Sequence, residues 1–125
     1  MSYSTASDIE MELGTAELVR LTNAGGETYN VLKILAAIDF ADLTINAYLG
    51  ARLETPLPAA KCGILRKISK DLAIYNLYEG ACARTSPPTG IVWKRQFAME
   101  MLEKVQSGDL RLPQNPGSVP AIIHN

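Results

Sequence analysis

The sequence predicts an all-α domain: a compact bundle of about five helices, two of them long and antiparallel, with an extended carboxyl-terminal tail. Apolar residues recur at helical spacing along most of the chain, and residues that start or stop helices separate these segments. The 125 residues suffice for one domain, and 47% hydrophobic with 20% charged residues is a globular balance. We expect a helical domain over residues 1–112 and an extended proline-rich arm over residues 113–125.

Two short helices are predicted at the amino end. Ser7 and Glu10 have the spacing of a capping box, which would start the first helix, and Gly14 is suited to end it. Thr15 can cap the second helix, which ends in the turn-forming residues 22–26.

Two long helices are predicted over about residues 29–53 and 59–83, because the prolines in segment 54–58 interrupt the helical pattern. The first carries two apolar stripes, which predict packing on more than one side. The stripes are Val31, Ile34, Leu35, Ile38, Ile45 and Leu49, and Leu32, Phe40, Leu43 and Ala47. The expected core residues of the two helices are Ile38, Ile45, Tyr48, Leu49, Leu65, Ile68, Leu72 and Tyr75.

A last helix is predicted between residues 85–88 and Gly108. A hydroxyl cap followed by prolines in the first turn would start it, and Ser107-Gly108 would end it. Its apolar positions are Ile91, Phe97, Ala98, Met101, Leu102 and Val105.

The tail differs in composition from the rest of the chain. Pro113, Pro116 and Pro120 preclude a regular helix, and Ile122-Ile123 is apolar. One interpretation is a frayed terminus. The other is an arm that docks in an extended conformation on a partner, with the two isoleucines as anchors.

Charge and cysteine content narrow the function classes. The net charge of −1 lacks the basic excess that is typical of nucleic-acid binders. Cys62 and Cys82 lie twenty positions apart on one predicted helix, which is roughly 30 Å and too far for a disulfide. Free thiols fit a reducing compartment such as a cytosol. No secretory signal or membrane-spanning run is recognisable in the sequence.

Candidate residues for chemistry are few. His124 is the single histidine and lies in the tail, and one histidine with two distant cysteines cannot form a zinc site. Asp42 and Asp71 interrupt apolar helix faces. A carboxylate pair can do acid–base work, but a buried ion pair or cap is the favoured interpretation, with Arg52, Arg66 and Arg84 as candidate partners. We therefore expect no enzyme activity, metal or cofactor.

Trp93 has two interpretations. It can anchor a partner interface, or it can pack within the chain. With Pro113, Pro116, Pro120, Ile122 and Ile123, it completes the set of predicted partner-interface residues.

Several motifs, in order and spacing, resemble the head–tail connector family of Mu-like phages and prophages. They cover about residues 3–112. The motifs are Asp8-Ile9, Leu13 to Leu18, Leu21-Thr22, Ile45 to Leu49 with Arg52, Thr55-Pro56-Leu57, Leu65 to Ile68, Asp71-Leu72-Ala73, Tyr75, Leu77-Tyr78, Leu102 to Val105, Gly108 and Leu112. Some members of that family have a more acidic loop where this chain has Ala24-Gly25-Gly26. A cation site in that loop is not expected here.

The resemblance implies an all-α adaptor, commonly in a dodecameric ring beneath the portal protein. Such a ring extends the DNA channel without sequence-specific binding and joins the filled head to the next neck or tail-completion protein. It implies a place in the neck of the virion, in the host cytoplasm during assembly, and no membrane. A ring needs head-to-tail contacts, so each subunit must present two different faces.

Two alternatives remain open from the sequence. A small helical regulator would bind protein or DNA, and the helix with Lys61, Arg66, Lys67 and Lys70 is its candidate recognition helix. Those charges are also explained as a solvated face. A small enzyme would use Asp42, Asp71 and nearby tyrosines.

Overall fold

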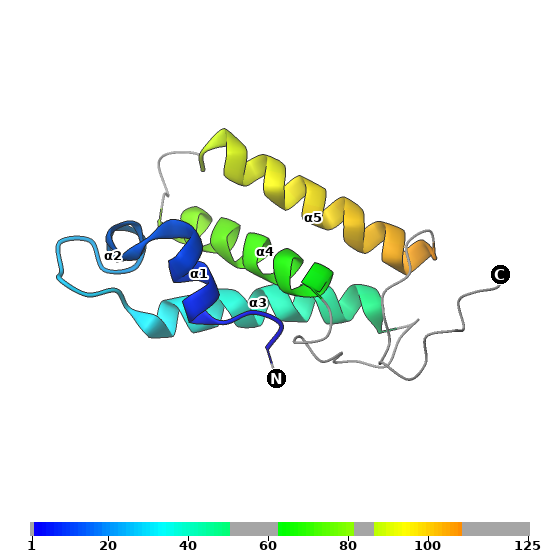
Figure 1. Ribbon diagram of the computed structural model, residues 1–125, viewed down its shortest axis with the longest axis horizontal. Coiled ribbons are helices and arrows are strands. Elements are labelled where there is room, and N and C mark those ends of the chain that lie inside the picture. The colour runs from blue at the N-terminus through cyan, green and yellow to red at the C-terminus, as the bar shows by residue number, and fades with distance from the viewer. Residues whose placement is uncertain (1, 51–62, 82–86, 109–125) are drawn as a thin grey trace.

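The computed structural model describes residues 2–50, 63–81 and 87–108 and contains five helices within these ranges (Figure 1). They are α1 (Ala6–Leu13), α2 (Thr15–Thr22), α3 (Val31–Leu49), α4 (Gly63–Ala81) and α5 (Thr89–Ser107). These residues contain no strand, so the all-α prediction is confirmed. None of the described helices is both long and apolar enough to cross a bilayer. The predictions for Arg52, Arg84, Pro113, Pro116, Pro120, Ile122 and Ile123 fall outside the described residues.

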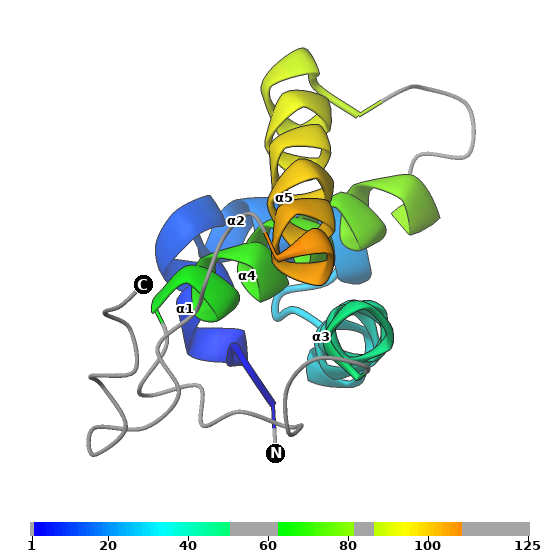
Figure 2. The same cartoon turned by 90° about the vertical axis from the view of Figure 1, so that its right-hand side faces the viewer.

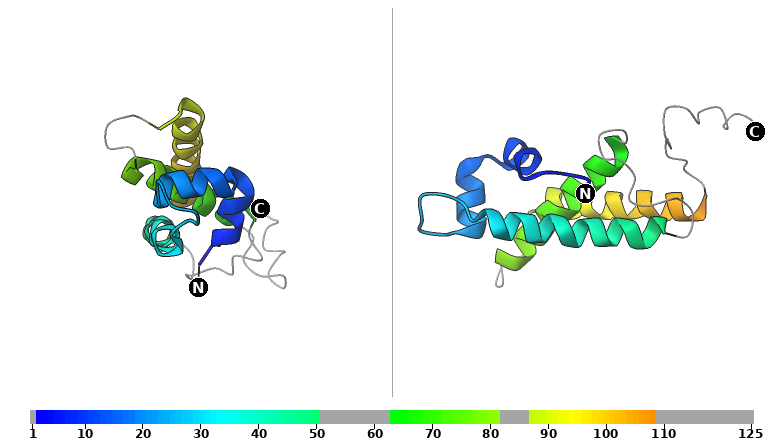
Figure 3. Two further views of the ribbon diagram at one scale, coloured as in Figure 1. Left: turned by 90° about the vertical axis from the view of Figure 1, so that its left-hand side faces the viewer. Right: turned by 90° about the horizontal axis from the view of Figure 1, so that it is seen from below.

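The bundle is organised around α4, which contacts each of the other four helices. α4 runs obliquely back along α3 in the opposite direction, and α5 lies on the other side of α4 (Figures 1 and 2). The pair α1 and α2 packs against α3 and α4 near the amino end of α3 (Figure 3). α3, α4 and α5 each have 19 residues, so the bundle has three long helices rather than the two expected.

The core forms where α4 meets its neighbours. Six of the predicted core residues are buried, whereas Tyr48 and Tyr75 are half-buried at the edge of the core. The six are Ile38, Ile45, Leu49, Leu65, Ile68 and Leu72. The first apolar stripe of α3 supplies much of this core through Ile34, Ile38, Ile45 and Leu49. The helix packed on most of its sides is therefore α4, not α3.

The first helix begins earlier than predicted. The capping box consists of Thr5 and Asp8 rather than Ser7 and Glu10. The Thr5 hydroxyl accepts from the Asp8 amide at 3.1 Å, and the Asp8 carboxylate accepts from the Thr5 amide at 3.0 Å. Tyr3 and Ser4, directly before Thr5, are both buried, so the chain is held in place where this box begins.

Glycine and asparagine set several other helix ends. Gly14 lies at φ 89° and ψ 154°, so it ends α1 and starts α2 as a one-residue corner. Thr15 is thus the first helical residue and not a cap. Asn30 caps α3 by accepting from the Leu32 amide at 3.0 Å. Gly108 ends α5 in the left-handed conformation, as predicted.

The start of α5 differs from the expectation. Pro88 is the residue before the helix, no side chain caps it, and the prolines thus precede the first turn rather than occupy it.

A buried carboxylate fastens the amino-terminal segment to the bundle. Asp42 of α3 is 8% exposed and accepts the Tyr3 amide at 3.3 Å and the Ser69 hydroxyl at 2.9 Å. The Ser4 and Ser69 hydroxyls lie 2.6 Å apart, and the Tyr3 hydroxyl donates to Asn46 at 2.6 Å. These bonds connect residues 3 and 4, α3 and α4 at one point.

The charged form of the Asp42 carboxyl is less favourable in this buried position than it would be in water. Burial raises the pKa of the Asp42 carboxyl, while the hydrogen bonds from Ser69 and the Tyr3 backbone act in the opposite direction. Asp42 was predicted to form an ion pair or a helix cap, and the contacts that it makes are of neither kind. Among the described residues, its partners are a backbone amide and hydroxyls.

Replacing Asp42 by alanine should destabilise the fold by about 1–3 kcal/mol, because it leaves the buried Tyr3 amide and Ser69 hydroxyl without their acceptor. Urea unfolding at neutral pH measures this loss. The matched control is Asp39→Ala, an exposed carboxylate on the same helix, which should change stability by less than about 0.5 kcal/mol. Equal effects of the two substitutions would contradict the role of Asp42.

Candidate functional site

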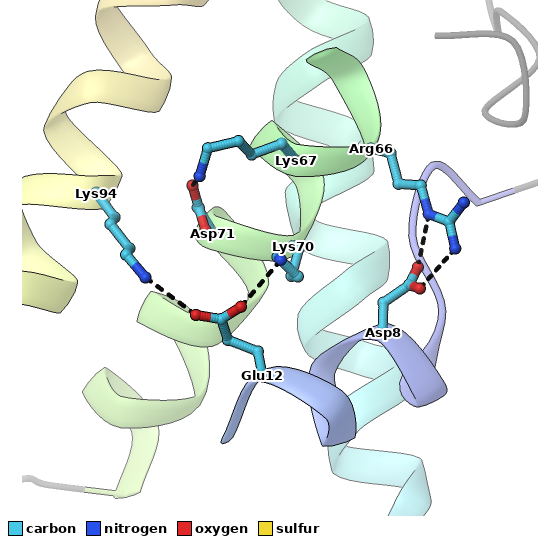
Figure 4. Close-up of polar contacts among 7 residues, drawn as sticks. All are labelled: Asp8, Glu12, Arg66, Lys67, Lys70, Asp71 and Lys94. Carbon is cyan, nitrogen blue, oxygen red and sulfur yellow. Dashed lines mark hydrogen bonds and ion pairs between the residues drawn. The ribbon is translucent and has the colours of Figure 1, made fainter. Parts of the chain in front are cut away.

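A charged cluster lies where α1 meets α4 and α5 (Figure 4). Asp8 of α1 accepts two hydrogen bonds from the Arg66 guanidinium of α4, at 2.7 and 3.2 Å. Glu12 of α1 pairs with Lys70 of α4 and Lys94 of α5, each at 3.0 Å. One carboxylate thus connects three helices.

These pairs favour the charged forms of their members. The Arg66 guanidinium lowers the pKa of the Asp8 carboxyl, and Lys94 and Lys70 lower that of the Glu12 carboxyl. Glu12 in turn raises the pKa of the Lys94 ammonium. An open groove runs over the cluster, lined by Asp8, Met11, Glu12, Gly63, Arg66, Lys67 and Lys70. Because the basic side chains of the groove are already paired with carboxylates, it offers little free positive charge.

Asp71 is in an ion pair, although with a lysine of its own helix rather than with an arginine. Its Oδ2 accepts from Lys67 at 2.8 Å, one turn earlier on α4, and the carboxylate is almost fully buried. Its Oδ1 has no hydrogen-bond partner within the described ranges. Arg66, a candidate partner of Asp42 or Asp71, pairs with Asp8 instead. Asp42 and Asp71 have separate sets of partners, and neither set resembles an acid–base pair.

A second polar contact joins α2 to α4. The Tyr78 hydroxyl donates to Glu17 in a very short hydrogen bond, and Arg20 donates twice to the same carboxylate, at 2.8 and 2.9 Å. Arg20 and Tyr78 hold the pKa of Glu17 at about 2, and burial together with Glu17 raises the pKa of Tyr78 to about 12. The guanidinium of Arg20 also lies 6.0 Å from the centre of the Tyr78 ring. This arrangement is a helix-to-helix clamp.

Large apolar side chains lie exposed along the outer side of α3. We call Leu32, Leu35, Phe40 and Leu43 the outer α3 patch. Leu32, Phe40 and Leu43 are 71%, 61% and 66% exposed, in a helix whose other side is fully buried. Most of the patch comes from the second apolar stripe of the sequence. The expectation that this stripe packs within the domain is wrong for these residues.

A second exposed apolar surface lies on α5. Trp93 is 68% and Phe97 54% exposed, and these two residues form the outer α5 patch. Trp93 therefore does not pack within the described part of the chain, and Phe97, one of the apolar positions of the predicted helix, is exposed there as well. In Figure 1, α5 forms the upper edge of the bundle and α3 the lower edge, so the two patches belong to different sides.

Sequence reasoning identified the apolar stripes but not which of them stays uncovered. Periodicity shows that a helix has an apolar face, whereas burial depends on neighbours that are distant in sequence. A search for groups of His, Cys, Asp and Glu that could hold a metal finds none among residues 2–50, 63–81 and 87–108.

Replacing Glu17 by glutamine should cost about 1 kcal/mol of stability at pH 7, since it weakens the clamp between α2 and α4. The lowered pKa of Glu17 means that its contribution is complete above about pH 4.5 and is lost as the pH falls toward 2. The difference between wild type and variant should therefore shrink between pH 5 and pH 3, as measured by urea unfolding at each pH. A constant difference would contradict the clamp, and Glu103→Gln, an exposed glutamate on α5, serves as the control.

Comparison with known proteins identifies the family. Residues 3–121 match the family model described as "Bacteriophage Mu, Gp36", which is nearly the whole chain. A search of curated proteins finds no match. The resemblance of the sequence motifs to a family of Mu-like phages is thereby confirmed, and the chain belongs to the bacteriophage Mu Gp36 family.

Proposed function

We propose that this chain is a structural subunit of the phage head–tail connector, an adaptor ring beneath the portal protein in the neck of the virion. In this role it extends the DNA channel and joins the filled head to the next neck or tail-completion protein. The role requires no catalysis and no cofactor. The single observation that carries it is the pair of exposed apolar patches on two sides of a chain from a phage protein family.

The patches support an assembly role for an energetic reason. Solitary soluble proteins rarely leave several large apolar side chains side by side in water, and such surfaces mark sites of association. Here Leu32 and Leu35 are one helical turn apart on α3, as are Phe40 and Leu43, and Trp93 and Phe97 are one turn apart on α5. A subunit with two such sides can contact a neighbour on each of them, as a ring requires.

The charged cluster argues against the alternative of a DNA-binding regulator. Arg66, Lys67 and Lys70 of α4 are three of the four basic residues a recognition helix would use, and each is paired with a carboxylate of this chain. The fourth, Lys61, lies outside the described residues. Phosphate binding would have to displace those carboxylates first, which removes much of the gain from counterion release. The same pairing suits a protein that surrounds DNA without holding it.

Removing the chain from its phage should yield filled heads and separate tails that do not join, because the connector would be missing. Electron microscopy of the lysate, with wild-type chain supplied in trans as the control, measures the outcome. An antibody against the chain should label the neck of complete particles. Normal joined particles without the chain, or label at another place on the virion, would rule out the connector role.

Truncation after Leu112 tests the predicted carboxyl-terminal arm, which falls outside the described residues. If the arm docks on a partner, the truncated chain should keep its helical circular dichroism and melting temperature but fail to complete infectious particles. Replacing Ile122 and Ile123 together by serine should give a milder form of the same defect, because only the anchors are lost. Normal infectivity of both variants would favour a frayed terminus instead.

A further inference from the structure

The amino-terminal half of α5 is held to the bundle less firmly than the rest of the helix. The buried side chains of α5 all lie from its middle onward: Ala98, Leu102 and Val105. Within the described ranges no residue of segment 89–97 is buried, and no side chain caps its start. Ile91 packs partly on the core, and the Arg95 guanidinium lies 4.9 Å from the centre of the Tyr75 ring. The ion pair of Lys94 is therefore a substantial part of what attaches this half.

Two carboxylates act on Lys94. Its ammonium donates to Glu12 of α1 at 3.0 Å. Glu12 has the largest effect in raising the pKa of Lys94, and the carboxylate of Asp71 on α4 raises it further. Figure 4 shows Asp71 on the side of α4 that faces α5, near the pair of Lys94 and Glu12. Lys94 thus has a second carboxylate close to the one that it contacts.

Asp71 has an oxygen to offer. Its Oδ2 accepts from Lys67, whereas its buried Oδ1 accepts from no donor in the described part of the chain. A buried carboxylate oxygen without a donor is unfavourable, so a second ammonium at Asp71 would be stabilising. Lys94 is half-exposed at 46% and has a flexible four-carbon stem, which suits it to a change of partner.

We infer that Lys94 is a two-position latch, which pairs with Glu12 in one conformation and with Oδ1 of Asp71 in another. In the first position α5 is tied to α1, and in the second it is tied to α4 alone. Glu12 keeps Lys70 in both positions, so the transfer leaves no member of the cluster without an opposite charge. The latch thereby lets the amino-terminal half of α5 move relative to α1 within a single copy, whether or not the chain is a connector subunit.

A double-mutant cycle tests the latch. Glu12→Ala removes the first position, and Asp71→Leu, a change of similar shape, removes the second. Hydrogen exchange of amides 93–97 in the full chain, relative to amides 102–105, measures opening of the amino-terminal half of α5. Each substitution alone should raise this exchange less than about 2-fold, because Lys94 keeps one partner. Both together should raise it about 5-fold, the upper value for an exposed ion pair.

Two further backgrounds identify the lysine that couples the carboxylates. In the Lys94→Met background the two substitutions should have additive effects, because the shared partner is gone. In the matched Lys70→Met background the coupling should persist, since Lys70 also pairs with Glu12 at 3.0 Å but belongs to α4. Coupling that survives Lys94→Met, or additive effects with Lys94 in place, would overturn the latch.

A crystal structure of the Glu12→Ala variant gives a test that does not depend on a substitution in the core. The Glu12 side chain is 32% exposed, so the variant should fold, and circular dichroism checks this. The Lys94 ammonium should then lie within about 3 Å of Oδ1 of Asp71. A Lys94 side chain that extends into solvent instead, with Asp71 unchanged, would show that the second position does not exist.

Discussion

The buried carboxylate of Asp42 is the constraint on which the packing of this bundle depends. An apolar residue at that position would remove the acceptor of the Tyr3 amide and the bond that ties the Ser69 hydroxyl to α3, in a region closed to water. Asp42 meets both needs and so decides which part of α4 lies beside α3 and where the amino-terminal segment enters. The cost of burying a carboxylate, seen in its raised pKa, is offset by this network of hydrogen bonds. Once α3, α4 and residues 3 and 4 are fixed together, the position of α1 follows, since its capping box begins at Thr5.

The position of α1 then determines the charged cluster and, through it, one of the contacts that hold α5. Glu12 reaches both α4 and α5 only because α1 lies across them, and its bond to Lys94 supplements the apolar packing of Ala98, Leu102 and Val105. With its inner side so fixed, α5 presents Trp93 and Phe97 outward. The exposed surfaces are therefore a consequence of how the interior of the described bundle is arranged.

The fold class and the ends of several helices were predictable because they depend on local sequence. The apolar periodicity predicted the all-α architecture. Gly14 and Gly108 predicted helix ends because glycine readily adopts the positive φ angles found there. The capping box was misplaced because the local motif favours Ser7 with Glu10, whereas the box that forms, Thr5 with Asp8, directly follows the buried residues Tyr3 and Ser4. The partners of Asp42 and Arg66 lie 27 to 58 residues away in sequence, so no local rule identifies them. The outer patches were partly predictable: their residues stood out as apolar stripes, but which stripe remains uncovered depends on the whole bundle.

The corner between α1 and α2 also limits how this protein can vary. Gly14 is exposed, and a methyl group added to it would meet no other atom within 4 Å. There is therefore space at this position for a larger side chain. Its backbone angles, however, belong to a region that essentially only glycine occupies, and any other residue there would cost about 1–3 kcal/mol in torsional strain. Related chains that keep a one-residue corner with these angles should therefore retain glycine there even though nothing touches it. Loss of that glycine in a relative would signal that the corner itself has been rebuilt.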